Sequence, residues 1–324
     1  MKAILALAAV VFAAVAAATD LDQARTLIEA NRLDEARAVL DRAVKDPAQR
    51  GESLVLLTRL ANVKEDYEAG LGFGKQALQA VPASSDAHYE YAVALRIKMG
   101  RASKLKAMML LGDYKDELAA AIRLDPKNVK PRLEEIGFLL NAPGIAGGDV
   151  AKARAKIAEL KPLDWRSATK MEAQALRKDG NLEGAVTTLR GLLARVADDY
   201  EARISLGLTL QELKRYNEAE EEFSKLLPVT ADQWSLAATY QLARTHILGR
   251  YEQNKAVEFL LDYIARVPDK AAGLAPRSAA YWRLGNAYEQ LAQVAKAREA
   301  YEKAIALDAG NDEAKKALKA LPKG

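Results

Sequence analysis

Two histidines are the side chains best suited to acid–base or metal chemistry, and their surroundings favour neither. His88 and His246 lie far apart in the chain, and neither has a second histidine or a paired carboxylate four residues further on. A metal site needs several converging ligands, usually at a recognisable spacing. Each histidine also falls where the repeat described below favours an aromatic or apolar residue. We therefore expect two packed histidines, each with one hydrogen bond.

The other residues that could carry chemistry, carboxylates and a glycine-rich loop, also stand in patterns that indicate structural roles. The carboxylate runs at 134–135 and 220–222 belong to helical patterns, where consecutive side chains point in different directions and usually form a solvated face. The glycine-rich loop at 141–153, NAPGIAGGDVAKA, follows a helix and lacks the Gly-Lys-Ser/Thr of a phosphate loop, which indicates a turn with Asp149 as the next helix cap. No Gly-x-Ser-x-Gly or Ser-x-x-Lys motif is present. We predict that the chain is not an enzyme and holds no cofactor and no metal.

Composition and the first residues suggest a compartment. The 324 residues carry 48 basic and 44 acidic side chains, a near balance that gives no reason to expect nucleic acid as a partner. Cysteine is absent, which excludes disulfides, thiolate chemistry and a lipid-attachment cysteine. Residues 1–18 hold one lysine and then an uncharged apolar run, shorter than the roughly 20 residues that span a bilayer. We expect a cleavable export signal and a periplasmic protein that does not span the membrane once cleaved, with secretion as the alternative.

A repeated helical pattern positions all of these residues. In the stretch 280–308, Leu284 and Tyr288 stand four apart, and Ala297, Tyr301 and Ala304 follow at helical spacing after a turn. The small residues Gly285 and Ala297 would let two helices approach, while Tyr288 and Tyr301 would fill the space between one hairpin and its neighbour. One such hairpin cannot bury its apolar face alone, so several must stack.

The pattern recurs along the chain with a period of 34 residues, as between Ala185 and Ala219. We predict an all-α solenoid, a right-handed superhelix of about eight helix-turn-helix repeats with a polar capping helix. The predicted repeats cover 20–48, 51–84, 85–126, 127–162, 164–197, 198–230, 233–270 and 276–309, and the cap covers 311–321.

Two repeats depart from the pattern. The second has glycines at two close-contact positions, Gly70 and Gly74, which indicates unusually near packing because glycine costs about 1 kcal/mol relative to alanine in a helix. The third is about ten residues longer than the others. We expect the insertion to form a lengthened helix that adds to the core or covers a groove, because it carries apolar patches. These patches consist of Leu105, Met108, Met109, Leu110 and Leu111.

The spacing within the repeats resembles that of the tetratricopeptide repeat, and the chain is similar to exported tetratricopeptide repeat proteins of proteobacteria. The segment AHYEYAVAL, the ending AAAIRLDP of the long repeat and the loop NAPGIAGGD resemble one subgroup of periplasmic members. The resemblance implies an adaptor that binds proteins or peptides, and it transfers no catalytic residue. Other similarities, to solenoids that accompany solute transporters and to microtubule regulators, imply no function here.

The same resemblance implies that the first helix of each repeat lines a concave groove. Aromatic and arginine side chains are frequent anchors at interfaces, and Lys170, Arg177 and Arg244 would suit carboxylates of an extended peptide. The inward template positions select thirteen candidate partner-binding residues: Arg59, Asn62, Tyr89, Arg96, Phe138, Lys170, Gln174, Arg177, Gln211, Tyr240, Arg244, Trp282 and Asn286.

The function that we predict is a scaffold for a protein or peptide partner in the cell envelope. Two alternatives stay open. One is a periplasmic carrier, associated with a transporter, in which the long third repeat covers a pocket for a small apolar or anionic molecule. The other is an envelope hydrolase, which the lack of a nucleophile or metal motif disfavours.

Overall fold

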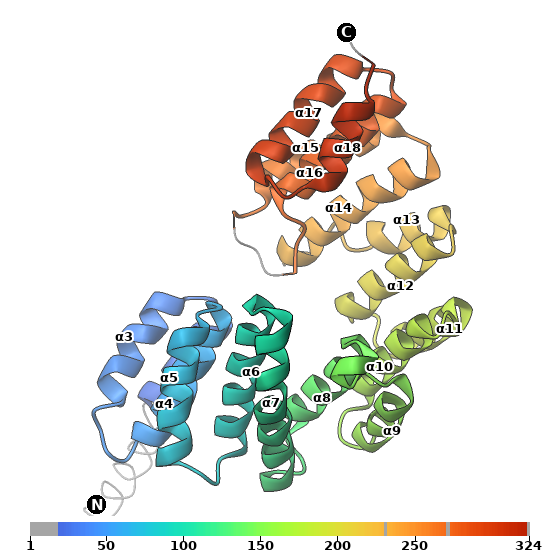
Figure 1. The fold of residues 1–324 in the computed structure, drawn as a ribbon. Helices are drawn as coiled ribbons and strands as arrows, with labels where there is room; N and C mark the ends of the chain where they lie inside the picture. The colour runs from blue at the N-terminus through green and yellow to red at the C-terminus, as the bar shows by residue number, and fades with distance from the viewer. Residues whose placement is uncertain (1–18, 230–231, 270–272, 323–324) are drawn as a thin grey trace, which may run out of the picture. The chain divides into compact units, whose positions relative to one another are not determined.

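The computed structural model describes residues 19–229, 232–269 and 273–322 (Figure 1). These residues form seventeen α-helices and one short 3₁₀ helix, with no strand among them. The all-α class predicted from the sequence is therefore confirmed. The predicted export signal, residues 1–18, lies outside the described residues. Across the described ranges, no helix combines the length and apolar character that crossing a membrane requires.

The chain divides into two compact units, one ending at Asp164 and the other beginning at Trp165. In the N-terminal unit, consecutive helices pack as antiparallel hairpins, and the first helices α2, α4 and α6 also contact one another in turn. Its helices are α2 (Asp20–Glu29), α3 (Leu33–Ala43), α4 (Arg50–Val63), α5 (Tyr67–Ala80), α6 (Ser85–Arg101), α7 (Lys104–Leu124), α8 (Val129–Asn141), the 3₁₀ helix η1 (Gly144–Ala146) and α9 (Val150–Leu160).

The C-terminal unit repeats the arrangement, with α12 against α14 and α14 against α16 as neighbouring first helices. Within each unit, the helices therefore stack hairpin on hairpin. The helices of this unit are α10 (Trp165–Lys178), α11 (Leu182–Arg195), α12 (Tyr200–Glu212), α13 (Tyr216–Ser224), α14 (Asp232–Gly249), α15 (Gln253–Arg266), α16 (Arg277–Gln290), α17 (Val294–Leu307) and the last helix, α18 (Asp312–Ala320). The prediction that all repeats form one continuous superhelix stays a prediction.

Polar side chains fix where the helices begin. The Asp66 carboxylate accepts from the backbone N–H of Ala69 at 3.1 Å, and Ser84 Oγ accepts from that of Ala87 at 3.2 Å. Asp149 caps α9 as predicted, because its carboxylate accepts from the N–H of Lys152 at 3.0 Å. These caps satisfy backbone donors that have no partner inside the helix.

The turns inside the hairpins use the left-handed backbone region, and most use it without glycine. Gly180 has φ 77° in its turn, while Asn31, Glu65, Lys214 and Ala292 reach φ between 54° and 59° in theirs. A side chain with a Cβ is strained in this region. The requirement for a tight two-helix turn therefore outweighs the local preference of these residues.

We expect Ala292→Gly to stabilise the C-terminal unit by about 0.5–1 kcal/mol, because it removes the left-handed strain of an exposed alanine. The matched change Ala295→Gly, at an exposed position in the first turn of α17, should instead destabilise the unit by up to about 1 kcal/mol. Urea unfolding followed by tryptophan fluorescence measures both. If both variants changed the free energy of unfolding in the same direction, the assignment of strain to Ala292 would be contradicted.

The glycines of the second repeat pack as closely as their positions predicted. A Cβ on Gly74 would lie 2.6 Å from Cδ2 of Tyr91, and one on Gly70 would lie 3.1 Å from Cβ of Ala94. Both neighbours belong to α6, which packs against α5. The two glycines thus let α5 and α6 approach closely, since a Cβ on Gly74 would overlap the Tyr91 ring and one on Gly70 would require its neighbours to shift slightly.

The insertion forms one long helix, α7, as expected, but only its C-terminal part joins the core. Leu110 and Leu111 pack against the buried cluster around Tyr114. Leu105 and Met109 are instead 73% and 74% exposed, contrary to the expectation that the whole patch packs or covers a groove. Among the residues described, the side of α7 that carries Leu105 and Met109 is therefore left uncovered.

Candidate binding surface

The predicted groove residues lie on the first helices of seven hairpins, and they divide between the two units. Arg59 and Asn62 belong to α4, Tyr89 and Arg96 to α6, and Phe138 to α8 of the N-terminal unit. The C-terminal unit holds the remaining eight: Lys170, Gln174 and Arg177 on α10, Gln211 on α12, Tyr240 and Arg244 on α14, and Trp282 and Asn286 on α16. Each unit therefore carries its own candidate surface.

The N-terminal unit has an open cavity of about 570 Å³ where α6, α7 and α8 meet. Three predicted residues, Tyr89, Arg96 and Phe138, line it. The structure thus brings together residues from two predicted repeats around one space. The other lining residues are Tyr114, Lys130, Leu133, Glu134, Gly137, Asn141 and Ala142.

Aromatic rings form the apolar wall of this cavity. The centroids of the Tyr114 and Phe138 rings lie 5.4 Å apart at a tilted angle, which is a favourable packing geometry. The ammonium group of Lys115 lies 5.2 Å from the Phe138 centroid. Burial is the main cause that raises the pKa of both Tyr89 and Tyr114 above the ordinary tyrosine value. Both hydroxyls therefore stay neutral, and that of Tyr114 donates a hydrogen bond to Glu134.

Charged groups lie beside the Tyr114 hydroxyl at this cavity. The Glu134 carboxylate accepts a hydrogen bond from the Tyr114 hydroxyl at 3.0 Å. It also forms an ion pair with Arg96, whose Nε lies 2.6 Å away. The Arg96 side chain stays 50% exposed, so its remaining donors can reach a ligand. The cavity therefore combines flat apolar contact with a guanidinium that is already oriented.

Seven of the ten lining residues were not among the predicted site residues, and they include Tyr114, Gly137 and Glu134. Tyr114 is fully buried and lies on the second helix of the long repeat, where the template predicts core packing. Gly137 lines the cavity with open space beside it, because a Cβ there would meet no atom within 4 Å. Glu134 was expected on a solvated face, and that expectation is wrong because Arg96 and Tyr114 bind it. The wrong expectation extends to Glu222, whose carboxylate pairs with Arg203 Nη1 at 2.6 Å while both side chains are largely buried.

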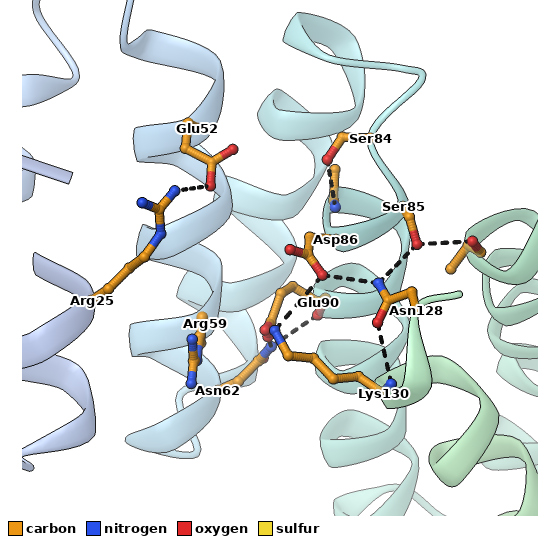
Figure 2. A network of polar contacts seen from close by, with 12 residues as sticks. Arg25, Glu52, Arg59, Asn62, Ser84, Ser85, Asp86, Glu90, Asn128 and Lys130 are labelled. Atoms are coloured by element: carbon orange, nitrogen blue, oxygen red, sulfur yellow. Dashed lines mark hydrogen bonds and ion pairs between the residues drawn. The ribbon is translucent and has the colours of Figure 1, made fainter. Parts of the chain in front are cut away.

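Asn62 and Arg59 lie beside a buried carboxylate rather than at the cavity (Figure 2). Asn62 is 8% exposed, and its Nδ2 donates to the backbone oxygen of Glu90 at 2.8 Å and to its Oε2 at 2.9 Å. Glu90 is itself only 5% exposed. Burial raises the pKa of Glu90 to about 7, while the hydrogen bond from Asn62 and the charges of Arg59 and Lys130 oppose the shift. Asn62 thus links α4 to α6.

In the C-terminal unit, the predicted cations on α10 already have acidic partners on α12 and in the loop before it. Lys170 forms an ion pair with Glu201 and lies 3.8 Å from Asp199 Oδ1. Arg177 forms an ion pair with Glu212. Gln174 lies between these two on the same helix. A carboxylate on a partner would therefore compete with carboxylates of the chain itself.

Gln211 and Arg244 form the link between α12 and α14. Arg244 Nη1 donates to Gln211 Oε1 at 2.6 Å, and Gln211 Nε2 donates to Thr245 Oγ1 at 2.7 Å. Burial and the neighbouring guanidinium of Arg283 lower the pKa of Arg244. Arg283, which was not predicted, stacks over the Trp282 ring at 4.1 Å from its centroid. Two arginines on successive first helices thus form a basic patch.

The remaining predicted residues serve the packing of their own repeats. Tyr240 is mostly buried, with its ring centroid 5.2 Å from that of Tyr263. Asn286 Oδ1 accepts from the Tyr301 hydroxyl at 2.7 Å. Their part in binding stays a prediction.

The two histidines pack against ring and carboxylate neighbours. His88 makes two contacts, with Nδ1 2.5 Å from Glu117 Oε2 and Nε2 3.1 Å from the Pro82 oxygen, so the expectation of one hydrogen bond is too low. His246 is fully buried between the rings of Tyr251 and Phe259. Its Nε2 lies 3.2 Å from a carboxylate oxygen of Glu220, without the alignment of a hydrogen bond. In the part of the chain that the structure describes, no three His, Asp or Glu side chains gather as metal ligands.

Comparisons with known proteins agree on the repeat. Sequence models described as the tetratricopeptide repeat match residues 21–85, 170–235 and 278–311, about half of the chain. No curated protein matches the chain in sequence.

Solved structures with the same fold cover most of the chain at low identity. A tetratricopeptide repeat protein from Parabacteroides merdae has a TM-score of 0.53 at 11% identity, covering 93% of this chain and 96% of its own. The APC/C hetero-tetramer Cut9–Hcn1 has a TM-score of 0.61 at 13% identity, covering 93% and 54%. A tetratricopeptide repeat protein of Thermus thermophilus has a TM-score of 0.52 at 20% identity, covering 59% and 97%. The helical solenoid predicted from the sequence is confirmed.

Proposed function

Because the chain belongs to the tetratricopeptide repeat proteins, we propose that it is a non-catalytic scaffold that binds a segment of a protein or peptide partner. Repeats of this kind act through the surface of their stacked helices. The observation that carries the proposal is the open cavity of the N-terminal unit, where Tyr89, Arg96 and Phe138 meet. These residues come from successive first helices, which is where a partner segment would lie.

The chemistry of the cavity favours a segment with one flat apolar side chain and a nearby anionic or carbonyl group. The partly exposed ring of Phe138, which packs on the buried ring of Tyr114, supplies apolar contact to the side chain. Arg96 is held by Glu134 and keeps donors for the second group. Because the guanidinium is already positioned, little side-chain freedom is lost when the partner binds.

A cavity-filling variant tests the proposal. We expect Gly137→Leu to fold normally, because a side chain there meets open space and leucine favours a helix. It should weaken the binding of peptides selected from a random display library on the parent protein by at least about tenfold, or about 1.4 kcal/mol. Isothermal calorimetry measures the affinities. The control Gly191→Leu places the same residue in open space on α11 and should bind like the parent.

Two outcomes would count against the scaffold proposal. The first is that no peptide is selected by the parent protein. The second is that peptides bind Gly137→Leu as tightly as the parent, which would place binding outside the cavity.

The size of the cavity favours a second candidate function, the binding of a small molecule. Its volume of about 570 Å³ falls in the range of known small-molecule sites, about 300–1,000 Å³. Native mass spectrometry of protein purified from its own cells would then show an added small mass. The same mass should be absent from Gly137→Leu and present in Gly191→Leu.

We place this scaffold in the cell envelope. The support is the apolar stretch at residues 1–18 and the absence of cysteine. Fractionation of cells with C-terminally tagged protein should give a periplasmic product shortened by about 18 residues. A cytoplasmic product of full mass would overturn the location and leave the scaffold role intact.

A further inference from the structure

The hairpin of α6 and α7 carries an exposed apolar stripe near its turn. Leu105, Met108 and Met109 are 73%, 53% and 74% exposed, and they stand three and four residues apart on one side of α7. Gly112 extends the same side by one turn and has open space around it. Large apolar side chains that cluster on the surface in this way mark interaction sites.

Basic residues surround the stripe. Lys104 and Lys106 flank Leu105 at about 100° on either side of the helix. Lys98 and Arg101 stand at the end of α6, which a two-residue link joins to α7. Residues 97–112 contain these four cations and no acidic residue.

Most of this charge is not neutralised within the chain. Arg101 Nη2 pairs with Glu65 at 2.8 Å. Lys98, Lys104 and Lys106 have no acidic partner in the described ranges. Acidic residues return only at Asp113 and Asp116, beyond the stripe. The tip, defined here as residues 98–109, is therefore apolar at its centre and cationic at its rim.

We propose that the tip docks on an anionic lipid surface. Apolar side chains at the centre would enter the boundary between headgroups and acyl chains, while the lysines at the rim would lie among the anionic headgroups. The charge pattern carries this choice of partner, because the rim has three unpaired cations and no acid to attract a basic protein. The contact is peripheral, and it goes beyond the scaffold function.

The position of the tip gives the docking a consequence for the cavity. Tyr114 lies on α7 just after the stripe, and it is fully buried against Phe138. The same rigid helix therefore carries the tip at one end and a wall of the cavity further along. Docking would hold the cavity of the N-terminal unit near the lipid surface.

Vesicle sedimentation with the full chain tests the proposal. We expect binding to vesicles of phosphatidylcholine with 30% phosphatidylglycerol, little binding to phosphatidylcholine alone, and weaker binding at 0.5 M salt, where charges are screened. Leu105→Ser with Met109→Ser, and separately Lys104→Glu with Lys106→Glu, should each weaken binding at least tenfold. Exposed residues of the C-terminal unit provide the matched controls Leu307→Ser and Lys316→Glu, which should bind like the parent protein.

Each other outcome overturns the proposal. Equal binding of the parent and the tip variants would show that the tip does not touch lipid. Absence of binding to anionic vesicles would do the same. A parent protein that self-associates through the tip, with loss of the dimer in Leu105→Ser and no vesicle binding, would assign the stripe to a second copy of the chain. Circular dichroism of the tip variants should match the parent, since the changed residues are exposed.

Discussion

Replacing Glu90 with glutamine is expected to stabilise the N-terminal unit by about 3 kcal/mol at pH 8, and by little near pH 4.5. Burial raises the pKa of Glu90 from its ordinary value of 4.5 to about 7. Between these two values, the folded protein holds a proton that the unfolded chain has released. The stability of the parent protein therefore falls as pH rises from about 4.5 to 7, and stays lowered above that.

The physical cause is the position of Glu90, which lies on α6 and is buried on the side where Asn62 of α4 meets it. It is 5% exposed, and its carboxylate has one hydrogen bond, from Asn62 Nδ2 at 2.9 Å (Figure 2). The positive charges of Arg59 and Lys130 do not offset the loss of water around the ionised group. Glutamine removes the charge and keeps an oxygen that can accept from Asn62.

Urea unfolding between pH 5 and pH 8 measures the effect. Circular dichroism reports both units, while all three tryptophans, Trp165, Trp234 and Trp282, lie in the C-terminal unit and provide a reference within the same sample. The control Glu52→Gln makes the same change at a more exposed carboxylate, which pairs with Arg25 at 2.7 Å, and should not stabilise the unit at pH 8. A Glu90→Gln variant with the same pH slope as the parent would contradict the buried charge.

The burial of Glu90 shows where prediction from the sequence stopped. The spacing of apolar residues predicted the helices, because it depends only on the geometry of one helix. A glutamate within the segment AHYEYAVAL gives no local sign of burial. Its surroundings depend on Asn62, 28 residues earlier, which a neighbouring repeat brings to it. Contacts between repeats were therefore the part that the pattern did not supply.

The residues of the candidate cavity also divide into those that the repeat pattern predicted and those that depend on contacts between repeats. Tyr89, Arg96 and Phe138 were predicted because the repeat template fixes which positions face inward. Tyr114 and Gly137 were not, because the long α7 changes which residues stand opposite α8. The exposed stripe at Leu105 and Met109 was expected to be covered for the same reason, since an apolar helix pattern does not show whether a neighbour is present. The contacts and exposed surfaces that the repeat template did not predict therefore lie mostly at or beside the insertion.

The close packing of helix pairs, by contrast, can be predicted from single glycines. We expect Gly285→Ala and Gly207→Ala each to destabilise the C-terminal unit by about 2 kcal/mol or more, although alanine usually favours a helix. A Cβ on Gly207 would lie 2.5 Å from Cζ of Phe223, and one on Gly285 would lie 2.7 Å from Cζ of Tyr301. Both rings are fully buried, so neither can move aside.

The location of these rings also adds to one expectation. Tyr301 was expected to fill the space between one hairpin and its neighbour, and it does share a buried cluster with Ala314 and Leu321 beyond its hairpin. Its ring also lies on Gly285 of the same hairpin, and its hydroxyl donates to Asn286, which the expectation did not include. The pair Gly207 and Phe223 repeats the contact in another repeat. A glycine on the first helix and an aromatic ring on the second therefore act together, and a change in either should affect the packing of that hairpin.

A third glycine makes the test independent of the general effect of alanine. Gly191 lies inside α11, where an added Cβ would meet no atom within 4 Å, so Gly191→Ala should stabilise the unit by up to about 1 kcal/mol. Tryptophan fluorescence in urea follows all three variants in the same unit. Stabilisation by all three would show that the rings can retreat, and that the hairpins tolerate wider spacing than the structure has. Because the changes add the same methyl group to a helix, only the space beside each glycine can make their signs differ.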